Sequence, residues 1–452
     1  MENNYRVSVI ESLKKIFKDK SYSNLVINND IKNIEHKYYS IYRKSVLGVI
    51  ENLIYIDWIV NHMSKTSTRK METEVLFTLR LAVYQLFFLE NSYENIVVNE
   101  SVEHIKKTGN IRASKFVNAV LRNIIRNKDK ITSDMKKLPF KEYLSVKYSY
   151  PEWLVLKWIE QFGKEEIEEV LIANNSEAPL TLRTNTLKTS RDELIDTLQN
   201  KGMVVHKSEY LDKGIIIENP SEIDKSNEYK NGLFSIQSES SMLAGQVLNP
   251  KENSIIIDLC AAPGGKSLNA SEMMNNTGKI ISRDIYINKI SLINKEKIRL
   301  GIKNIEVETF DATNLDENLI GKADYCIVDV PCTGLGIIRR KPEIKYNKLE
   351  SDLETIPKIQ YKILDNASKY LKVNGELIYS TCTVNKEENI NIIKSFLKHN
   401  KNFTTVDISN ETKNKFSTST VGYIEIYPHL HHMDGFFIAK LKRLWYNTIR
   451  LS

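Results

Sequence analysis

The sequence predicts a multidomain chain: an all-α N-terminal domain, a small α/β linker domain, and a C-terminal α/β domain with a mainly parallel, doubly wound sheet. Three observations support this prediction. Residues 1–130 contain no proline and repeat apolar side chains at helical spacing. From residue 250 onward, short apolar runs alternate with helical stretches, as they do in parallel sheets. A length of 452 residues also leaves room for several domains.

The all-α domain is placed at residues 1–135 because two apolar stripes recur there at helical spacing. The first stripe is Leu76, Leu79, Val83, Leu86 and Phe87, and the second is Phe116, Val117, Val120, Leu121 and Ile124. The helical pattern breaks around Pro139 and Pro151, which indicates a connecting region.

The small α/β domain is placed at residues 136–230. Residues 151–163 predict a short helix with Pro151 at its start and Gly163 at its end. Farther along, the pattern predicts a strand at 179–185, a helix at 190–202, and strands at 203–209 and 214–220.

The third domain is placed at residues 231–452. Its apolar runs predict strands at 254–259, 279–284, 304–310, 323–330 and 375–381, with helices at 287–300, 352–371 and 385–398. Ligands of such sheets bind at the carboxyl ends of the strands. The side chains at those ends are Asp258, Asp284, Asp311, Asp329, Cys332 and Cys382. A functional site is therefore expected at this edge.

Composition excludes several classes of protein. Hydrophobic residues make up 41% of the chain and charged residues 27%, which argues against general disorder. Four cysteines are too few for a disulfide scaffold. No apolar run approaches the ~18–20 residues of a membrane span, and the charged N-terminus is unlike a signal peptide. We expect a soluble cytoplasmic monomer without membrane contact.

No metal site is predicted either. The cysteines lack C-x-x-C spacing, and a packing or surface role suits the histidines His429, His431 and His432. Cys326 lies inside an apolar run and is expected to be a buried packing residue.

The net charge of +7 is concentrated near the N-terminus. Residues 1–140 hold 23 Lys and Arg against 15 Asp and Glu, which accounts for the whole excess. The densest segment carries Lys106, Lys107, Arg112, Lys115, Arg122, Arg126, Lys128 and Lys130, with Asp129 as its only acid. Such a surface can bind phosphates, although charge alone favours an ordinary solvated helix face.

The motif DLCAAPGGKS at residues 258–267 follows the first strand of the third domain and opens a helix. Its small side chains let the backbone approach a ligand closely. Asp284 suits a ribose diol, and Asp311 could accept from an adenine amino group. A phosphate loop of the G-x-x-x-x-G-K-[ST] type would need glycine at Cys260, and no G-x-G-x-x-G occurs. A ligand with adenosine but no pyrophosphate fits better, which favours S-adenosylmethionine.

Cys332 and Cys382 both lie just beyond predicted strands, on the side of the sheet that carries Asp329. A thiol beside a methyl donor suits methylation of carbon 5 of cytosine. That carbon is a poor nucleophile, but addition of a thiolate at carbon 6 turns the ring into a reactive enamine. After methyl transfer, the ring proton leaves and the thiol is eliminated. Asp329 is placed to stabilise charge at the N3 edge of the base. Spacing alone does not decide which cysteine attacks.

Four long motifs carry a family resemblance: DLCAAPGGKS, DVPCTGLGIIRRKPEIKY, YSTCTVNKEEN and MDGFFIAKLKR. They resemble those of the bacterial 16S rRNA (cytosine-C5) methyltransferases of the RsmB type, also called Fmu or Sun. The segments LRLAVYQLFFLE, VVNESVEHIKKTG and KFVNAVLRNIIR resemble the NusB-like helical RNA-binding domain of this subfamily. The resemblance implies a Rossmann-like S-adenosylmethionine methyltransferase domain at the C-terminal end.

The resemblance also implies an activity and its residues. The enzyme would methylate carbon 5 of a cytosine in 16S rRNA through a covalent cysteine–cytosine adduct. Cys382 would be the nucleophile, Cys332 would assist release of the methylated base, Asp329 would contact the cytosine N3/N4 edge, and Lys266 would lie near donor and base. The donor pocket would comprise Cys260, Ala261, Ala262, Pro263, Gly264, Gly265, Lys266, Asp284, Asp311 and Asp329.

Two rival functions remain at this point. One is the same chemistry on tRNA, which the NusB-like segments disfavour. The other is a non-catalytic RNA-binding protein with a degenerate methyltransferase fold. The joint presence of Cys332, Cys382 and Asp329 argues against that second alternative.

Overall fold

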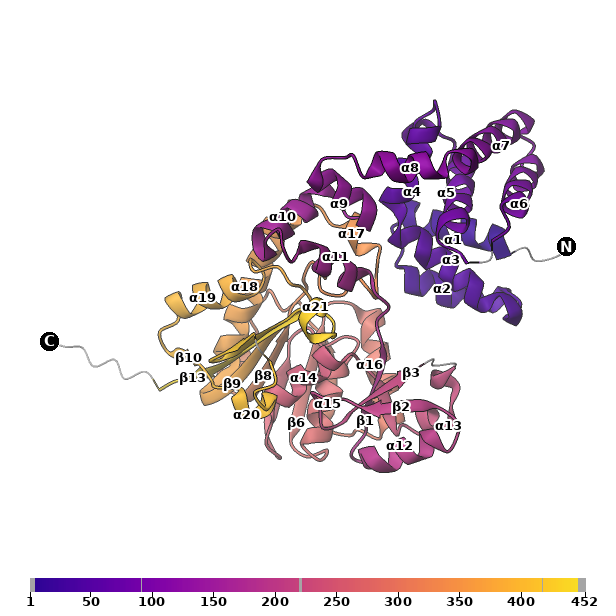
Figure 1. Cartoon of the computed structure of the whole chain (residues 1–452). Helices are drawn as coiled ribbons and strands as arrows, with labels where there is room; N and C mark the ends of the chain where they lie inside the picture. Colours follow the sequence, from indigo (N-terminus) through magenta and orange to yellow (C-terminus); the bar gives the residue numbers. More distant parts are fainter. Residues whose placement is uncertain (1–4, 91, 219–221, 417, 446–452) are drawn as a thin grey trace. The chain divides into compact units, whose positions relative to one another are not determined.

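The computed structural model describes residues 5–90, 92–218, 222–416 and 418–445 and forms two compact units (Figure 1). The first unit comprises residues 1–176 and 338–350, and the second comprises the rest of the chain. Among the described residues, no helix is long and apolar enough to cross a membrane.

The first unit is all-α. Its helices are α1 (Tyr5–Lys18), α2 (Ser23–Asp30), α3 (Tyr39–Glu51), α4 (Leu53–Met63), α5 (Thr73–Phe87), α6 (Glu94–Lys107), α7 (Ile111–Arg126), α8 (Lys128–Met135), α9 (Phe140–Tyr148), α10 (Glu152–Phe162), α11 (Ile167–Asn175) and α17 (Ile344–Asn347). Helix α5 packs against α1, α3, α4, α6 and α7 and supplies much of the core. The predicted stripes bury Leu79, Val83, Val117 and Leu121 completely.

A segment from the later part of the chain completes this unit. Within residues 338–350, the side chain of Lys345 is fully buried, and its ammonium group donates to the carbonyl oxygen of Glu51 (2.8 Å). Burial lowers the pKa of Lys345 to about 7. Glu343, also buried, accepts hydrogen bonds from the backbone N–H and the hydroxyl group of Ser23 (3.1 and 2.8 Å). These contacts fix the segment in the helical core.

The second unit begins with a four-stranded antiparallel sheet in the order β2-β3-β1-β4. Its elements are β1 (Leu180–Thr184), α12 (Arg191–Gln199), β2 (Val204–Lys207), β3 (Gly214–Glu218), α13 (Asn227–Lys230) and β4 (Phe234–Ile236). The three predicted strands and the predicted helix are present. Helix α12 begins where the sequence predicts, because Ser190 and Glu193 form a capping box. The three-residue strand β4 was not predicted.

The larger sheet has the order β11-β12-β13-β9-β8-β5-β6-β7, with β10 paired to β13. Its strands are β5 (Ile255–Asp258), β6 (Lys279–Asp284), β7 (Ile305–Thr309), β8 (Ala323–Asp329), β9 (Leu371–Thr381), β10 (Phe403–Thr405), β11 (Ser419–Thr420), β12 (Tyr423–Ile426) and β13 (Phe436–Arg443). Strands β5 to β9 pair in parallel, as predicted. The antiparallel strands β10 to β13 extend the β9 edge and were not predicted.

Helices cover both faces of this sheet (Figure 1). One face packs against α14 (Glu239–Leu248), α15 (Gly265–Met273) and α16 (Ile287–Leu300), and the other against α18 (Asp352–Tyr370) and α19 (Ile390–His399). Successive residues of each strand point to opposite faces, so Ile256 joins the first core and Ile257 the second. Cys326 is fully buried in the second core, as predicted. The helix predicted at 385–398 starts only at Ile390.

Candidate active site

The carboxyl ends of β5 to β9 meet along one edge of the large sheet because these strands are parallel. Asp329, the last residue of β8, lies opposite Ser380 near the end of β9. Asp284 ends β6 opposite Thr309 of β7. The strand ends named from the sequence are therefore neighbours in space.

Residues 259–264 form the glycine-containing loop between β5 and α15. Gly264 has a φ of +107°, a backbone conformation that side chains rarely adopt. A Cβ atom on Gly265 would lie 3.2 Å from the Nε2 atom of Gln237, a close contact that the Gln237 side chain would have to relieve by moving slightly. The backbone N–H of Ala262 donates to Asp284 Oδ2 (3.2 Å), which ties the loop to the end of β6.

Two acids beside this loop have defined partners. Asp284 is buried and also accepts from the backbone N–H of Tyr286 through Oδ1 (3.0 Å). Asp311 is half-buried and accepts from the N–H and the hydroxyl group of Thr313 through Oδ1 (2.9 and 2.8 Å). A carboxylate oxygen has more than one acceptor site, so both acids can still bind ligand donors.

The pKa of the Cys260 thiol in this loop reflects the acidic side chains around it. Burial raises the pKa of the Cys260 thiol well above its ordinary value. The negative charges of Asp258, Asp329, Asp284 and Asp311 raise it further. Four strand-end carboxylates thus surround one loop, although they are separated by up to 71 residues of sequence.

Asp329 and Lys266 form the most direct contact at this edge. The Lys266 ammonium group lies 2.6 Å from Asp329 Oδ2, 3.3 Å from the Ser241 hydroxyl group and 5.2 Å from the centre of the Phe436 ring. The hydroxyl group of Ser380 donates to Asp329 Oδ1 (2.7 Å). Lys266 is 7% exposed, whereas the Asp329 side chain is 32% exposed. The carboxylate is therefore oriented by two donors while still open to solvent.

The two strand-end cysteines are in contact. Cys332 Sγ lies 3.2 Å from Cys382 Sγ, and both side chains are partly exposed. The hydrogen bond with Cys382 raises the pKa of the Cys332 thiol, and burial and the charge of Glu388 add to that effect. The structure therefore brings together the pair that the sequence singled out. Their separate roles remain predictions.

Several residues near this site were not identified from the sequence. Ser241, Ser380 and Phe436 contact Lys266 or Asp329, and Glu388 lies next to the Cys332 loop. Ser380 lies in the predicted strand end Ser380-Thr381-Cys382, where a site is expected, but the sequence assigned it no role. Phe436 could not have been found from these strand ends, because its strand pairs with β9 only through long-range contacts.

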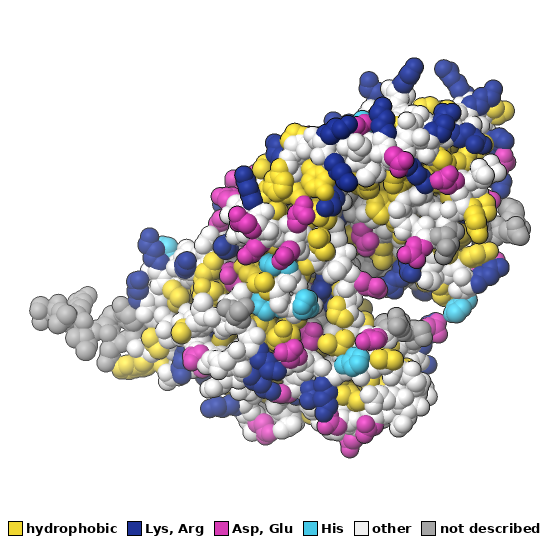
Figure 2. All heavy atoms as spheres, viewed as in Figure 1, with side chains coloured by type: hydrophobic (Ala, Val, Ile, Leu, Met, Phe, Trp, Pro, Cys, Tyr) yellow, Lys and Arg dark blue, Asp and Glu magenta, His cyan; other side chains and the backbone are white. Residues whose placement is uncertain are grey.

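A basic surface lies on the helical unit (Figure 2). The buried face of α7 contains Val117 and Leu121, and α7 carries no acidic residue. The exposed basic side chains of α6, α7 and α8 are Lys106, Lys107, Arg112, Lys115, Arg122, Arg126 and Lys130. Lys128 is half-buried and pairs with Glu94 (2.6 Å). A group of exposed positive charges on three successive helices is suited to binding phosphates.

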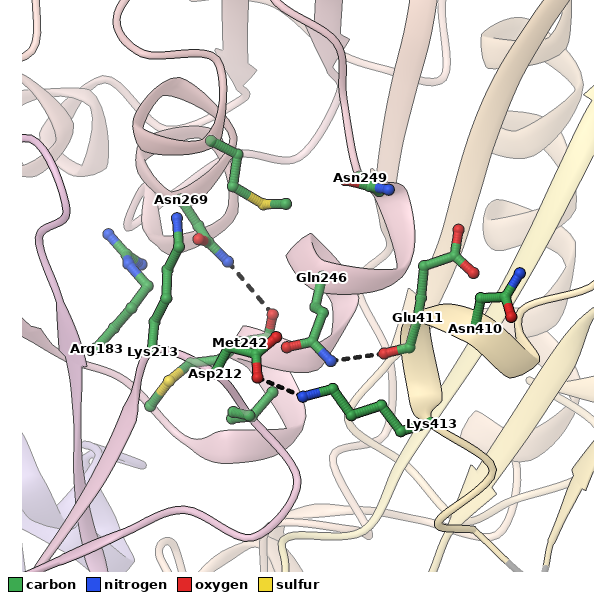
Figure 3. Close-up of a pocket in the computed structure, with 12 residues that line it drawn as sticks. Arg183, Asp212, Lys213, Met242, Gln246, Asn249, Asn269, Asn410, Glu411 and Lys413 are labelled. Carbon is green, nitrogen blue, oxygen red and sulfur yellow. Dashed lines mark hydrogen bonds and ion pairs between the residues drawn. The ribbon is translucent and has the colours of Figure 1, made fainter. Parts of the chain in front are cut away.

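A cavity of about 220 Å³ lies elsewhere in the second unit (Figure 3). Its lining contains none of the predicted site residues. Asn269 donates to the carbonyl oxygen of Met242 (3.3 Å), and Gln246 donates to that of Glu411 (2.6 Å). Much of its polar lining is thus engaged within the protein. Across the described part of the chain, no group of three His, Cys, Asp or Glu side chains could hold a metal ion.

Comparison with known proteins identifies the family. The family described as "16S rRNA methyltransferase RsmB/F" matches residues 245–442, the NusB family matches 3–126, and the "Methyltr_RsmF/B-like, ferredoxin-like domain" matches 150–224. The chain is 33% identical over 444 residues to the "Probable ribosomal RNA small subunit methyltransferase B" of Bacillus subtilis (strain 168). That alignment covers 96% of this chain and 97% of the relative. The chain belongs to the RsmB/F family.

Other relatives extend beyond bacteria. The 28S rRNA (cytosine-C(5))-methyltransferase of Mus musculus is 34% identical over 315 residues, covering 66% of this chain and 40% of that protein. The crystal structure of NSun6 from Pyrococcus horikoshii with SFG superposes with a TM-score of 0.59 and 25% identity, covering 66% of this chain and 99% of the other. The resemblance stated from the motifs is confirmed. So is the predicted fold class, with a NusB-type helical domain, a small ferredoxin-like domain and a Rossmann-like methyltransferase domain.

Proposed function

We propose that this RsmB/F protein transfers a methyl group from S-adenosylmethionine to carbon 5 of a cytosine in 16S rRNA, through a covalent adduct with Cys382. The observation that carries the proposal is the contact between the Cys332 and Cys382 sulfur atoms at 3.2 Å. Asp329 ends one of the same two strands and pairs with Lys266 of α15. A buried structural cysteine would need neither a second thiol nor an adjacent oriented carboxylate.

The loop before α15 fits the methyl donor. The loop backbone is held beside Asp284 by the N–H of Ala262, and Asp284 offers acceptors for ribose hydroxyl groups. Asp311 offers an acceptor near the adenine end, at the next strand along the sheet. S-adenosylmethionine, when bound there, supplies an activated methyl group.

The first chemical task of the chain is to activate the base. The Cys382 thiolate would attack carbon 6 of the cytosine, forming a C–S bond and making carbon 5 nucleophilic. Cys332, as the protonated partner, can donate its S–H to the Cys382 sulfur and favour that thiolate. Asp329, fixed by Lys266 and Ser380, would accept from the exocyclic amino group and orient the ring.

The second task is to release the methylated base. Once Cys382 is bonded to carbon, its charge no longer opposes ionisation of Cys332, which can lose its proton to solvent. The Cys332 thiolate then takes the proton from carbon 5. The electrons of that C–H bond restore the ring double bond, and the C–S bond breaks to return the Cys382 thiolate. Overall, one proton is released for each methyl group transferred.

The helical unit would bind the RNA through the exposed basic side chains of α6 to α8. Such contacts position a nucleic acid without selecting a base, so the choice of cytosine falls to the site at the sheet edge. A target base must also be unpaired or turned out of its helix before a thiol can reach carbon 6. All the groups named here lie on one chain, so the proposed chemistry needs no second copy, and we propose that the protein acts as a monomer in the cytoplasm.

A direct test uses purified protein, radiolabelled S-adenosylmethionine and unmethylated small-subunit rRNA. We expect labelled 5-methylcytosine at a defined position with the wild-type chain. Cys382→Ser should abolish turnover, because a hydroxyl group is far less ionised than a thiol near neutral pH. Near-normal activity of that variant would refute the nucleophile assignment. In a parallel reaction with unmethylated tRNA, label in tRNA and none in rRNA would refute the proposed substrate.

A further inference from the structure

A second contact lies one residue beyond the two sulfur atoms. Thr333 follows Cys332, and Thr383 follows Cys382. The two threonine hydroxyl groups are 2.9 Å apart, and both side chains are buried. The loops that follow β8 and β9 are thus joined twice in succession, first by the thiols and then by the hydroxyl groups.

Glu388 lies beneath this contact with no exposed surface. Its Oε1 atom accepts from the Thr333 hydroxyl group (2.5 Å) and from Asn385 Nδ2 (3.1 Å). Its Oε2 atom accepts from the Thr333 backbone N–H (2.8 Å) and from Gln360 Nε2 (3.1 Å). Three N–H groups and one hydroxyl group point at these two oxygen atoms, an arrangement that suits a carboxylate, which only accepts hydrogen bonds. A buried charge with this many partners is well compensated.

The direction of the hydrogen bonds follows from that charge. The Thr333 hydroxyl group has one proton, which it donates to Glu388, so it must accept the proton of the Thr383 hydroxyl group. The amide of Gln360 also donates to the carbonyl oxygen of Pro331 (3.0 Å), just before Cys332. One carboxylate therefore orders the residues on both sides of Cys332 and the residue after Cys382.

We propose that Glu388 is a positioning residue that holds the Cys332 and Cys382 loops together and so keeps the two sulfur atoms in contact. This inference rests on the proposed function, in which both thiols act on one base. It bonds directly to the residue after Cys332, and the Thr333 hydroxyl group links it to Thr383, the residue after Cys382. Its negative charge disfavours ionisation of Cys332, which agrees with the proposed role of Cys382 as the attacking thiolate.

Three variants of the full-length chain test the proposal. Glu388→Gln keeps the size of the side chain, removes the charge and places an NH2 group against two of the four donors. Glu387→Gln is the matched control, because Glu387 is the same residue type one position earlier and is exposed. Thr333→Val, compared with Thr333→Ser, removes only the hydroxyl group from the cluster and serves where Glu388→Gln does not fold.

Three measurements are made on each variant. Calorimetry gives the affinity for S-adenosylmethionine, and single-turnover reactions give the rate of methyl transfer to rRNA across a range of pH. Peptide mapping gives the rate at which diamide oxidises Cys332 and Cys382 to a disulfide. We expect Glu388→Gln to bind the donor within about twofold of the wild type and to transfer methyl groups about 10²-fold more slowly, since misplacement by about 1 Å has that effect. Disulfide formation, corrected for the ionisation of Cys332 through its dependence on pH, should slow about tenfold, because separated loops lower the effective concentration of the thiols.

The pH dependence of methyl transfer and the control variants give further expected results. At alkaline pH, the rate of methyl transfer by Glu388→Gln should begin to fall at a lower pH than the rate of the wild type. The reason is that Cys332 ionises more readily without the neighbouring charge. Glu387→Gln and Thr333→Ser should match the wild type. Thr333→Val should resemble Glu388→Gln.

Wild-type rates of methyl transfer and of disulfide formation in Glu388→Gln would overturn the proposal. So would a slow methyl transfer with an unchanged rate of disulfide formation, because Glu388 would then not act by holding the sulfur atoms. A wild-type chain that methylates no rRNA would refute the proposed function instead. The disulfide rates would still decide whether Glu388 positions the thiols.

Discussion

Asp258 ends β5 beneath the glycine-containing loop, and its side chain has no exposed surface. Burial raises the pKa of this carboxyl group, a hydrogen bond from the Ser267 hydroxyl group (2.6 Å) opposes the rise and the charge of Asp329 adds to it, so that the pKa is about 7. In the unfolded chain the pKa would be about 3.9. Between pH 4 and 7 the folded protein therefore holds a proton that the unfolded chain has released.

The sign and size of the effect on stability follow from that difference. Because the folded state binds more protons in this window, the free energy of unfolding falls as pH rises. A pKa difference of about 3 corresponds to about 4 kcal/mol over the whole window, at about 1.4 kcal/mol for each unit. About 3 kcal/mol of this would be lost between pH 5 and pH 8.

Asp258→Asn removes the titrating group and keeps an acceptor for Ser267. Urea unfolding followed by circular dichroism at pH 5, 6, 7 and 8 measures the effect. We expect the wild type to lose about 3 kcal/mol relative to Asp258→Asn over this range, whereas the exposed control Asp196→Asn should follow the wild type. Parallel pH dependences for the wild type and Asp258→Asn would refute the reasoning.

Three further outcomes test the donor loop, the small domain and the basic surface. Asp284→Ala should weaken S-adenosylmethionine binding about tenfold or more by calorimetry and leave RNA affinity unchanged, since it removes acceptors for ribose hydroxyl groups. Arg183→Met should lower the free energy of unfolding, measured in urea, by about 3–5 kcal/mol, because it leaves the buried Glu272 carboxylate, which lies 2.7 Å from the Arg183 guanidinium group, without its partner. Replacing both residues by Met should restore much of that loss. Arg122→Glu with Arg126→Glu should weaken rRNA binding and reduce the salt dependence by about one counterion for each phosphate that is no longer neutralised, with donor affinity unchanged.

Local patterns predicted much of the fold. The helix at 287–300 matches α16 residue for residue, because its apolar positions recur at helical spacing and Gly301 ends it with a φ of +79°. The parallel strands β5, β6, β8 and β9 were found because both of their faces are largely buried, which gives continuous apolar runs, whereas the edge strand β7 alternates apolar and polar residues. The strand ends then placed the acids and the two cysteines at one edge.

The features that were missed depend on long-range contacts. The helix predicted at 385–398 begins at Ile390 because the residues before it form a loop around buried Glu388. Nothing local separates Glu388 from exposed Glu387, since burial is set by Gln360 and Thr333, far away in sequence. Lys345 likewise belongs to a residue type that usually lies on the surface, yet it is buried in the core of the helical unit.

The central claim is that Cys382 attacks the base and Cys332 releases it, and a trapped adduct tests this most directly. Cys332→Ala and Cys382→Ala are each incubated with S-adenosylmethionine and rRNA and separated on a denaturing gel. We predict that Cys332→Ala accumulates a covalent protein–RNA complex, because attack and methyl transfer proceed but release does not. The shifted band should require both S-adenosylmethionine and Cys382. A trapped complex in Cys382→Ala, with none in Cys332→Ala, would contradict the account and reverse the two roles.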